Sequence, residues 1–267
     1  MDTASLIGIN AGYLALTFLP PVLWLMFYLR EDRHPEPKLL LLLTFIGGMI
    51  SVVIAIVGEC AFAQVANGGS CENGMDYAAK NVFTLFLAIA CIEEYVKYLV
   101  VKLLVLKRKD FDEPVDAMIY MITAALGFAA VENALFIFPL FHQSLLLGLE
   151  ITTNRFLGAN LLHALSSAIV GFFLARAWFS PRRPHFIALG IIIASFLHAM
   201  FNYLILVRDA LSQGTLYLVL LLGLMAVVVF IDFERLRSRE SVEGGDAGED
   251  RSPPPPPPPP NTPNTSI

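Results

Sequence analysis

Seven apolar stretches divide this chain, and each is long enough to cross a lipid bilayer, which needs about 20 residues. They cover roughly residues 5–29, 39–58, 81–106, 115–138, 156–179, 186–207 and 215–232. Only 15% of the residues are charged, whereas a soluble domain carries roughly 25%. The sequence therefore predicts an all-α fold, a polytopic bundle of about seven transmembrane helices that is multi-pass in the cell membrane and surrounded by the lipid bilayer.

Basic residues are divided unevenly between the two sets of connecting loops. One set holds twelve Lys or Arg residues, and the opposite set holds only Lys80, Arg155 and Arg208. Because cytoplasmic loops carry an excess of basic residues, we expect the N-terminus outside and the C-terminus in the cytoplasm. No basic and aromatic pattern suited to nucleic acid occurs in the sequence, so we expect no nucleic-acid partner.

The composition changes sharply near the C-terminus. We assign 1–235 to a transmembrane domain and 236–267 to a disordered cytoplasmic tail, because the tail is rich in Glu, Gly and Asp and contains eight consecutive prolines. A polyproline-binding partner could recognise it, although a plain tail is the simpler interpretation.

On the predicted outer side, residues 59–80 form a loop whose Cys60 and Cys71 either pair or stay as free thiols. Cys91, inside a span, is interpreted as a packing residue.

Five ionisable side chains lie inside the apolar spans: Glu93, Glu94, Glu132, His163 and His198. Such groups are costly in hydrocarbon, and a chain that keeps them on four separate helices usually uses them. Counted from the predicted outer helix ends, all five lie between the outer half and the midplane of the membrane. One shared cavity, open to the outside, is therefore compatible with their depths.

The paired acids differ in their expected local partners. Glu93 and Lys97 are four residues apart, acid first, which favours an ion pair on one helix face. Glu94 is rotated by about 100° and has no obvious partner on its own helix. A lone acid beside an ion pair suits general-base chemistry, whereas the alternative is that both acids serve only in structural ion pairs. A further charged segment, 107–116, is interpreted mainly as the solvated start of a helix, with Asp116 near its N-terminus.

Six short blocks, in order, carry a family resemblance over nearly all of residues 20–207. They are Tyr28 followed by Pro35-Glu36-Pro37, Glu93-Glu94-x-x-Lys97, Phe111-Asp112-Glu113-Pro114 with Asp116, Leu126-Gly127-Phe128-Ala129 leading into Glu132-Asn133, His163-Ala164 with Gly171 and Ala175, and Leu197-His198. In these blocks the chain resembles the PrsW family of intramembrane proteases, which is similar to the wider superfamily of CAAX-type prenyl endopeptidases.

The resemblance implies a membrane-embedded endopeptidase that cleaves a membrane-anchored protein substrate. Members of the family are associated with first-site cleavage of membrane-bound anti-sigma factors on the extracytoplasmic side. The chain departs from the family at Asn202, where an acid often follows the last His by four residues. In the prenyl endopeptidases an Asn at the comparable place helps to hold the oxyanion.

We predict peptide hydrolysis by an activated water, with no covalent intermediate and no cofactor. Glu94, or its neighbour Glu93, would act as general base, and Lys97 would hold Glu93. Glu132 or His163 would orient the water or share its proton. No Ser or Cys lies in an evident nucleophile setting beside a base, which argues against covalent catalysis.

The remaining polar residues would stabilise the transition state. His198 and Asn202, which share a helix face, would donate hydrogen bonds to the oxyanion. A metal-dependent alternative uses the same groups: His163, His198 and Glu132 could hold Zn²⁺, leaving another Glu as base. Two non-enzymatic alternatives are a proton-coupled transporter, since Glu and His chains also relay protons, and a scaffold in which polar groups only join helices.

Overall fold

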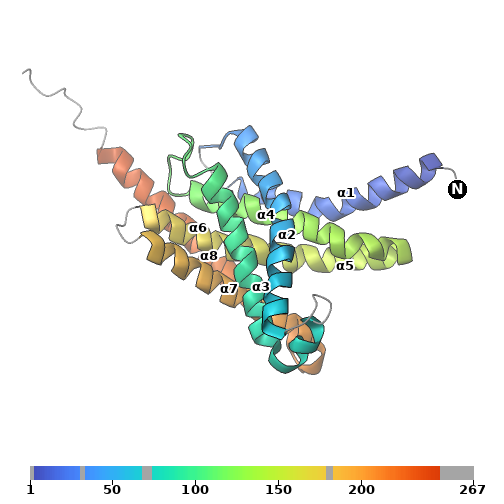
Figure 1. Cartoon of the computed structure of the whole chain (residues 1–267). Coiled ribbons are helices and arrows are strands. Elements are labelled where there is room, and N and C mark those ends of the chain that lie inside the picture. Colours follow the sequence, from blue (N-terminus) through green and yellow to red (C-terminus); the bar gives the residue numbers. More distant parts are fainter. Residues whose placement is uncertain (1–2, 31–33, 68–73, 179–182, 247–267) are drawn as a thin grey trace, which may run out of the picture.

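The computed structural model describes residues 3–30, 34–67, 74–178 and 183–246 (Figure 1). This part of the chain forms α1 (Thr3–Tyr28), α2 (Lys38–Asn67), α3 (Gly74–Leu104), α4 (Asp116–Gln143), α5 (Leu145–Leu157), α6 (Ala159–Trp178), α7 (Arg183–Val207), the 3-10 helix η2 (Arg208–Ala210) and α8 (Gly214–Asp246). Those residues include no strand. The predicted all-α fold is confirmed.

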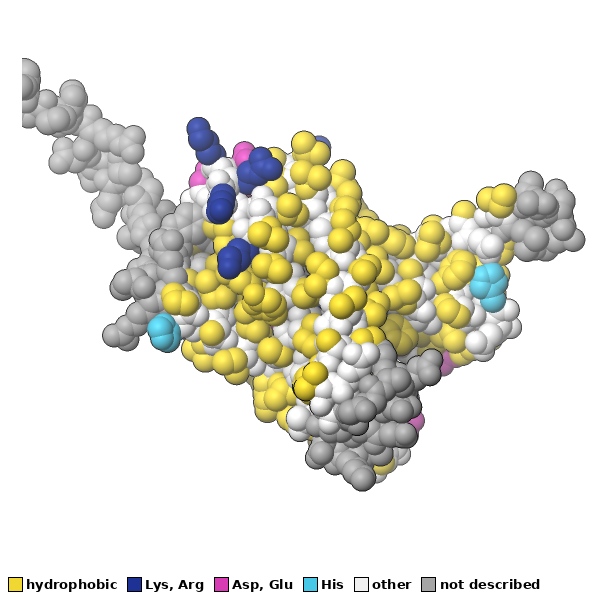
Figure 2. All heavy atoms as spheres, in the orientation of Figure 1, with side chains coloured by type: hydrophobic (Ala, Val, Ile, Leu, Met, Phe, Trp, Pro, Cys, Tyr) yellow, Lys and Arg dark blue, Asp and Glu magenta, His cyan; other side chains and the backbone are white. Residues whose placement is uncertain are grey.

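Six helical segments are long and apolar enough to cross a membrane, in α1, α2, α4, the consecutive α5 and α6, α7, and α8. Helix α3 is as long as these, with 31 residues, and carries the charged residues that the sequence places inside a span. Apolar side chains cover much of the surface, while Lys and Arg gather over the end of α3 and the loop after it (Figure 2). The multi-pass membrane fold is confirmed, and its orientation stays a prediction.

Helix α4 lies at the centre of the bundle, in contact with α1, α2, α3, α5 and α6. Every residue from Asp116 to Ala130 is buried, as expected for a helix that is apolar on all sides. The seam with α2 depends on two glycines: a Cβ at Gly48 would collide with the Ala124 carbonyl, and one at Gly127 with the Phe45 carbonyl. Small residues allow this close backbone approach between membrane helices.

The predicted outer loop at 59–80 is shorter than expected, because α2 continues to Asn67 and α3 begins at Gly74. Glu59 therefore lies on a helix. Cys60 is disulfide-bonded, and its expected partner Cys71 lies outside the described residues. Cys91 is a free and exposed thiol, so its interpretation as a packing residue is wrong.

Two further boundaries differ from expectation. Helix α5 occupies a segment predicted as a loop, and Ser144 caps its start by accepting a hydrogen bond from the Leu147 N–H at 3.5 Å. Helix α8 continues to Asp246, past the boundary predicted between the transmembrane domain and the tail. The proline run of the predicted tail lies outside the described residues.

Candidate active site

Helix α3 places two acids and one base within reach of one another. The Lys97 Nζ lies 3.3 Å from Glu93 Oε2 and 3.0 Å from Glu94 Oε1, and Lys97 is fully buried. The expectation that Glu94 lacks a partner on its own helix is wrong, because residues three apart on a helix also face each other. One ammonium group therefore serves both carboxylates.

Three further donors, from two other helices, surround the Glu94 carboxylate. On α6, the Ser166 hydroxyl donates to Oε1 at 2.9 Å and the Ser167 hydroxyl to Oε2 at 2.7 Å. On α7, the His198 Nδ1 lies 3.1 Å from Oε1. With Lys97, four donors hold a carboxylate that has no exposed surface. The two serines follow His163 by three and four residues on one helix face, but no role was predicted for them.

The partners of the two imidazoles determine which ring nitrogens carry hydrogen. His163 Nε2 lies 2.8 Å from Glu132 Oε2, and its Nδ1 lies 2.8 Å from Lys97 Nζ. His198 directs its Nδ1 to Glu94. Because an ionised carboxylate only accepts, we assign the proton to Nε2 of His163 and Nδ1 of His198. The lone pairs are then on Nδ1 of His163 and Nε2 of His198.

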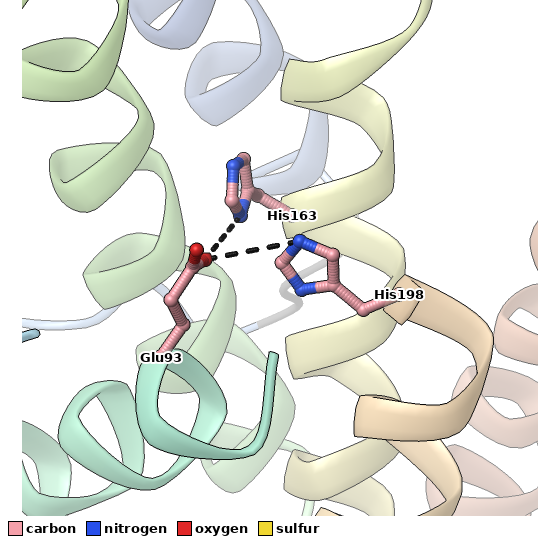
Figure 3. Close-up of side chains that lie close together, drawn as sticks. All are labelled: Glu93, His163 and His198. Carbon is pink, nitrogen blue, oxygen red and sulfur yellow. Dashed lines mark ion pairs between the residues drawn. The ribbon is translucent and has the colours of Figure 1, made fainter. Parts of the chain in front are cut away.

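Both lone pairs face the same carboxylate oxygen (Figure 3). Glu93 Oε2 lies 3.9 Å from His163 Nδ1 and 3.8 Å from His198 Nε2. One ligand atom from each of these three buried residues lies within 4.8 Å of the others. Three acceptors that converge in a buried place repel one another unless a cation lies among them. Lys97 is one such cation, since it contacts two of the three acceptors.

These three acceptors also fit a divalent metal ion. Zinc binds carboxylate oxygen and imidazole nitrogen at about 2.0–2.2 Å in tetrahedral sites, which separates the ligand atoms by roughly 3.4 Å. The two separations that involve Glu93 Oε2, 3.8 and 3.9 Å, are slightly longer, and the separation of the two ring nitrogens is at most 4.8 Å. Each imidazole bonds its outer nitrogen to a carboxylate, the usual support of metal-binding His. The third acceptor is Glu93, whereas the ligand set expected from the sequence contained Glu132.

A cleft of about 580 Å³ reaches this cluster from the surface. Residues of α2, α3, α4, α5 and α7 line it, and most of them are apolar. Its polar lining residues are Glu59, Glu93, Glu132, Arg155 and Asn202. Glu94, His163 and His198 lie behind this surface and are not among the lining residues. A cleft of this volume with a mostly apolar lining and a few polar groups can hold a short peptide segment beside Glu93.

The sequence profile of the PrsW family, described as intramembrane metalloproteases, matches residues 36–231. This chain belongs to the PrsW family. It is 30% identical over 184 residues to Protease PrsW of Geobacillus kaustophilus strain HTA426, covering 68% of this chain and 74% of the relative. It is 29% identical over 195 residues to Protease PrsW of Bacillus subtilis strain 168, covering 72% and 80%. No solved structure matches.

Membership of the PrsW family makes the chain an intramembrane protease with a protein substrate. The enzyme predicted from the sequence is confirmed, and neither the transporter nor the scaffold alternative is supported. In this PrsW protease the residues predicted for the site lie together, from α3, α4, α6 and α7. Asn202 lines the cleft one helical turn beyond His198. The individual roles assigned to these residues stay predictions.

Sequence reasoning missed the residue that holds Glu132. Arg155, on α5, donates to Glu132 Oε2 at 2.6 Å and, through Nε, to Asn133 Oδ1 at 2.6 Å. Asn133 in turn donates to Asn160 Oδ1 at 3.0 Å. The charge analysis counted Arg155 with the outer loops. The adjacent polar pair Glu132-Asn133, inside an apolar span, was the available signal that a cation should lie nearby.

Proposed function

We propose that this PrsW-family protease hydrolyses a peptide bond of a membrane-anchored protein in the cleft, by attack of an activated water. The observation that carries the proposal is the convergence of two imidazole lone pairs on Glu93 Oε2, because Glu93 also lines an open cleft. The contacts favour Glu93 over Glu94 as the acid beside the reacting water. Glu93 lines the cleft, whereas Glu94 is enclosed by four donors.

We propose further that Glu93, His163 and His198 hold a divalent metal ion such as Zn²⁺. A bound metal of this kind supplies a nucleophilic water near neutral pH and polarises the substrate carbonyl. Glu132 and Glu94 keep the two rings in the orientation that directs their lone pairs inward. In the metal-free alternative predicted from the sequence, the Lys97 ammonium is the cation among the acceptors, and Glu93 alone takes the proton from water.

Two residues of the cleft wall complete the proposed chemistry. Glu132 is partly exposed, so it can receive a proton from the attacking water and return it to the leaving amine. Arg155 and His163 hold its Oε2 in place. The Asn202 amide lines the same cleft and can donate to the oxyanion, a role that typically accounts for 10²–10³ in rate.

We propose that cleavage takes place on the extracytoplasmic side. The cleft includes Glu59, and the next residue, Cys60, is disulfide-bonded. Disulfides persist in oxidising compartments outside the cytosol, so this bond supports an extracytoplasmic position for the adjoining end of the cleft. A membrane-bound anti-sigma factor is the substrate we propose, on the family resemblance described in the sequence analysis.

The test uses purified, detergent-solubilised enzyme and a single-span membrane protein as substrate. Cleavage is measured before chelation, after a strong chelator, and after zinc is added back, and bound metal is quantified by mass spectrometry. We expect chelation to abolish cleavage, zinc to restore it, and His198→Ala to lose bound metal. His185→Ala, which changes an exposed imidazole at the start of α7, is the matched control. Cleavage that survives the chelator with no metal bound would favour the metal-free mechanism.

A further inference from the structure

A second hollow, of about 670 Å³, lies far from the catalytic cluster, between the C-terminal ends of α6 and α8. Four apolar side chains line it: Phe172, Phe230, Ile231 and Leu236. Its polar lining comes from Arg176, Glu234, Arg235 and Ser238. In Figure 1 these two helix ends lie beside the start of α7, at the end of the bundle for which the Lys and Arg distribution predicts a cytoplasmic position.

The charges of this hollow leave one cation in excess. Glu234 is paired with Arg237 at 3.0 Å, and Arg235 with the buried Asp232 at 3.4 Å. The Arg176 guanidinium forms no ion pair within 4 Å in the part of the chain that the structure describes, although it attracts the Asp232 carboxylate from a greater distance. It lies over two rings instead, 5.8 Å from the centroid of Phe172 and 5.7 Å from that of Phe186. This contact holds a positive charge at the mouth of an apolar hollow.

The position of the hollow near the membrane surface and the apolar surface beside it indicate what kind of molecule fits. Helices α6 and α8 both contain candidate membrane spans, so their ends lie near the lipid headgroups. Along α8, the apolar lining continues into the exposed side chains of Val227 and Val228, which face outward from the bundle. A molecule that places a negative group at Arg176 and an acyl chain along this apolar surface matches both parts. Basic pockets between membrane helices at the cytoplasmic side are suited to anionic lipid headgroups.

We propose that this hollow binds an anionic diacyl phospholipid, with the headgroup phosphate at Arg176 and one acyl chain against Phe230 and Ile231. The site is independent of the proteolytic chemistry. A lipid bound there joins the end of α8 to α6, the helix that carries His163 nearer its other end. A free phosphate would use only the polar lining, chiefly Arg176, and would leave the apolar wall uncovered.

The test is native mass spectrometry of the full chain in detergent, titrated with phosphatidylglycerol or phosphatidylcholine of the same acyl chains. A basic side chain beside an anionic lipid contributes about fivefold in affinity. We therefore expect about fivefold tighter binding of phosphatidylglycerol, lost in Arg176→Gln and largely kept in Arg176→Lys. Arg208→Gln, at the exposed pair with Asp209, is the matched control and should change nothing.

Three results would overturn the proposal. The first is equal affinity of the wild-type chain for the two lipids, a comparison that holds even if Arg176→Gln does not fold. The second is an undiminished preference for phosphatidylglycerol in a folded Arg176→Gln variant. The third is complete displacement of the lipid by excess inorganic phosphate, which would make the hollow a site for anions alone.

Discussion

Helix α4 contributes to two buried polar clusters, and the two differ in what surrounds their carboxylates. Near its start, the Tyr120 hydroxyl donates to Glu36 Oε2 at 2.6 Å, and Asp116 Oδ2 accepts the backbone N–H groups of Asp112 and Glu113 at 3.0 and 2.8 Å. Asp116 is therefore buried, and its interpretation as part of a solvated helix start is wrong. Neutral donors satisfy these acids, and the Asp116 and Glu36 side chains also hydrogen-bond to each other, as they would at a structural site.

The second cluster combines carboxylates with imidazoles and cations, and it adjoins an open cleft. Glu93, His163 and His198 turn acceptors toward one point, where Lys97 contacts two of the three, whereas Asp116 and Glu36 accept from a tyrosine hydroxyl and backbone N–H groups. A buried acid is therefore weak evidence of catalysis when its donors are in place. Converging acceptors at the end of a cleft are stronger evidence, because they leave a position for a cation or a reacting water.

The largest effect should separate two matched changes, Glu93→Gln and Asp116→Asn. We expect Glu93→Gln to lower the cleavage rate by about 10²–10⁴ without loss of folded protein, because it removes the acid beside the reacting water. Asp116→Asn should keep the rate per folded molecule and lower the free energy of unfolding by about 1–3 kcal/mol. Cleavage assays and thermal unfolding measure the two effects. The reverse outcome would mean that the chemistry has been assigned to the wrong cluster.

A smaller effect is expected at Arg155, which positions Glu132. Arg155→Gln should lower kcat by about 10–100-fold with little change in KM, as for other residues that orient a site through a second group. Arg155→Lys should recover part of this loss, because it restores the charge without the second hydrogen bond to Asn133. Arg208→Gln is the control. A rise in KM at constant kcat would instead mean that Arg155 binds the substrate.

Two buried serines give a matched pair with a still smaller difference. The Ser167 hydroxyl donates to Glu94 at 2.7 Å, whereas the Ser195 hydroxyl, equally buried on α7, has no hydrogen-bond partner in the described structure. We expect Ser167→Ala to slow cleavage by about tenfold, the lower end of the effect of such supporting groups. Ser195→Ala should be near neutral in rate and in melting temperature. If the two changes had equal effects on the rate, the hydrogen bond from Ser167 to Glu94 would not support catalysis.

The smallest effect on activity is expected at Tyr120. Tyr120→Phe removes the hydroxyl that donates to Glu36, which should lower the free energy of unfolding by about 1–2 kcal/mol. The rate of cleavage per folded molecule should stay unchanged. Denaturant unfolding and a cleavage assay on the same preparation check both values. A loss of activity that exceeds the loss of folded protein would mean that the two clusters on α4 are coupled.

The order of the spans, and six of the seven, could be predicted because lipid leaves an apolar run as the signature of each helix, whereas the charged α3 does not meet that criterion. Helix α5 escaped this reasoning, since Glu150, Thr152, Asn154 and Arg155 interrupt its apolar pattern. Glu59 was likewise assigned to a loop, because the end of α2 is not marked by a change in composition. Helix ends and short polar helices depend on packing that composition does not record.

Within the site, the ionisable residues could be identified, but their contacts could not. The direction of the His163 and His198 lone pairs depends on how α3, α6 and α7 cross. Arg155 lies 23 positions from Glu132 and on a different helix, so no local spacing joins them. Ser166 and Ser167 stand at helical spacing from His163. They could have been predicted as partners of Glu94 if its partners had been sought on other helices.

The glycine seam between α2 and α4 limits how a substrate can gain access. Gly48 and Gly127 bring the two backbones into direct contact. If α2 moved away from α4, the gap would stay unfilled, because neither glycine has a side chain that could keep contact across it. We therefore expect α2 and α4 to stay packed together when a substrate binds. If a transmembrane substrate enters sideways from the bilayer, we expect α5 or α7, which also line the cleft, to move in order to admit it.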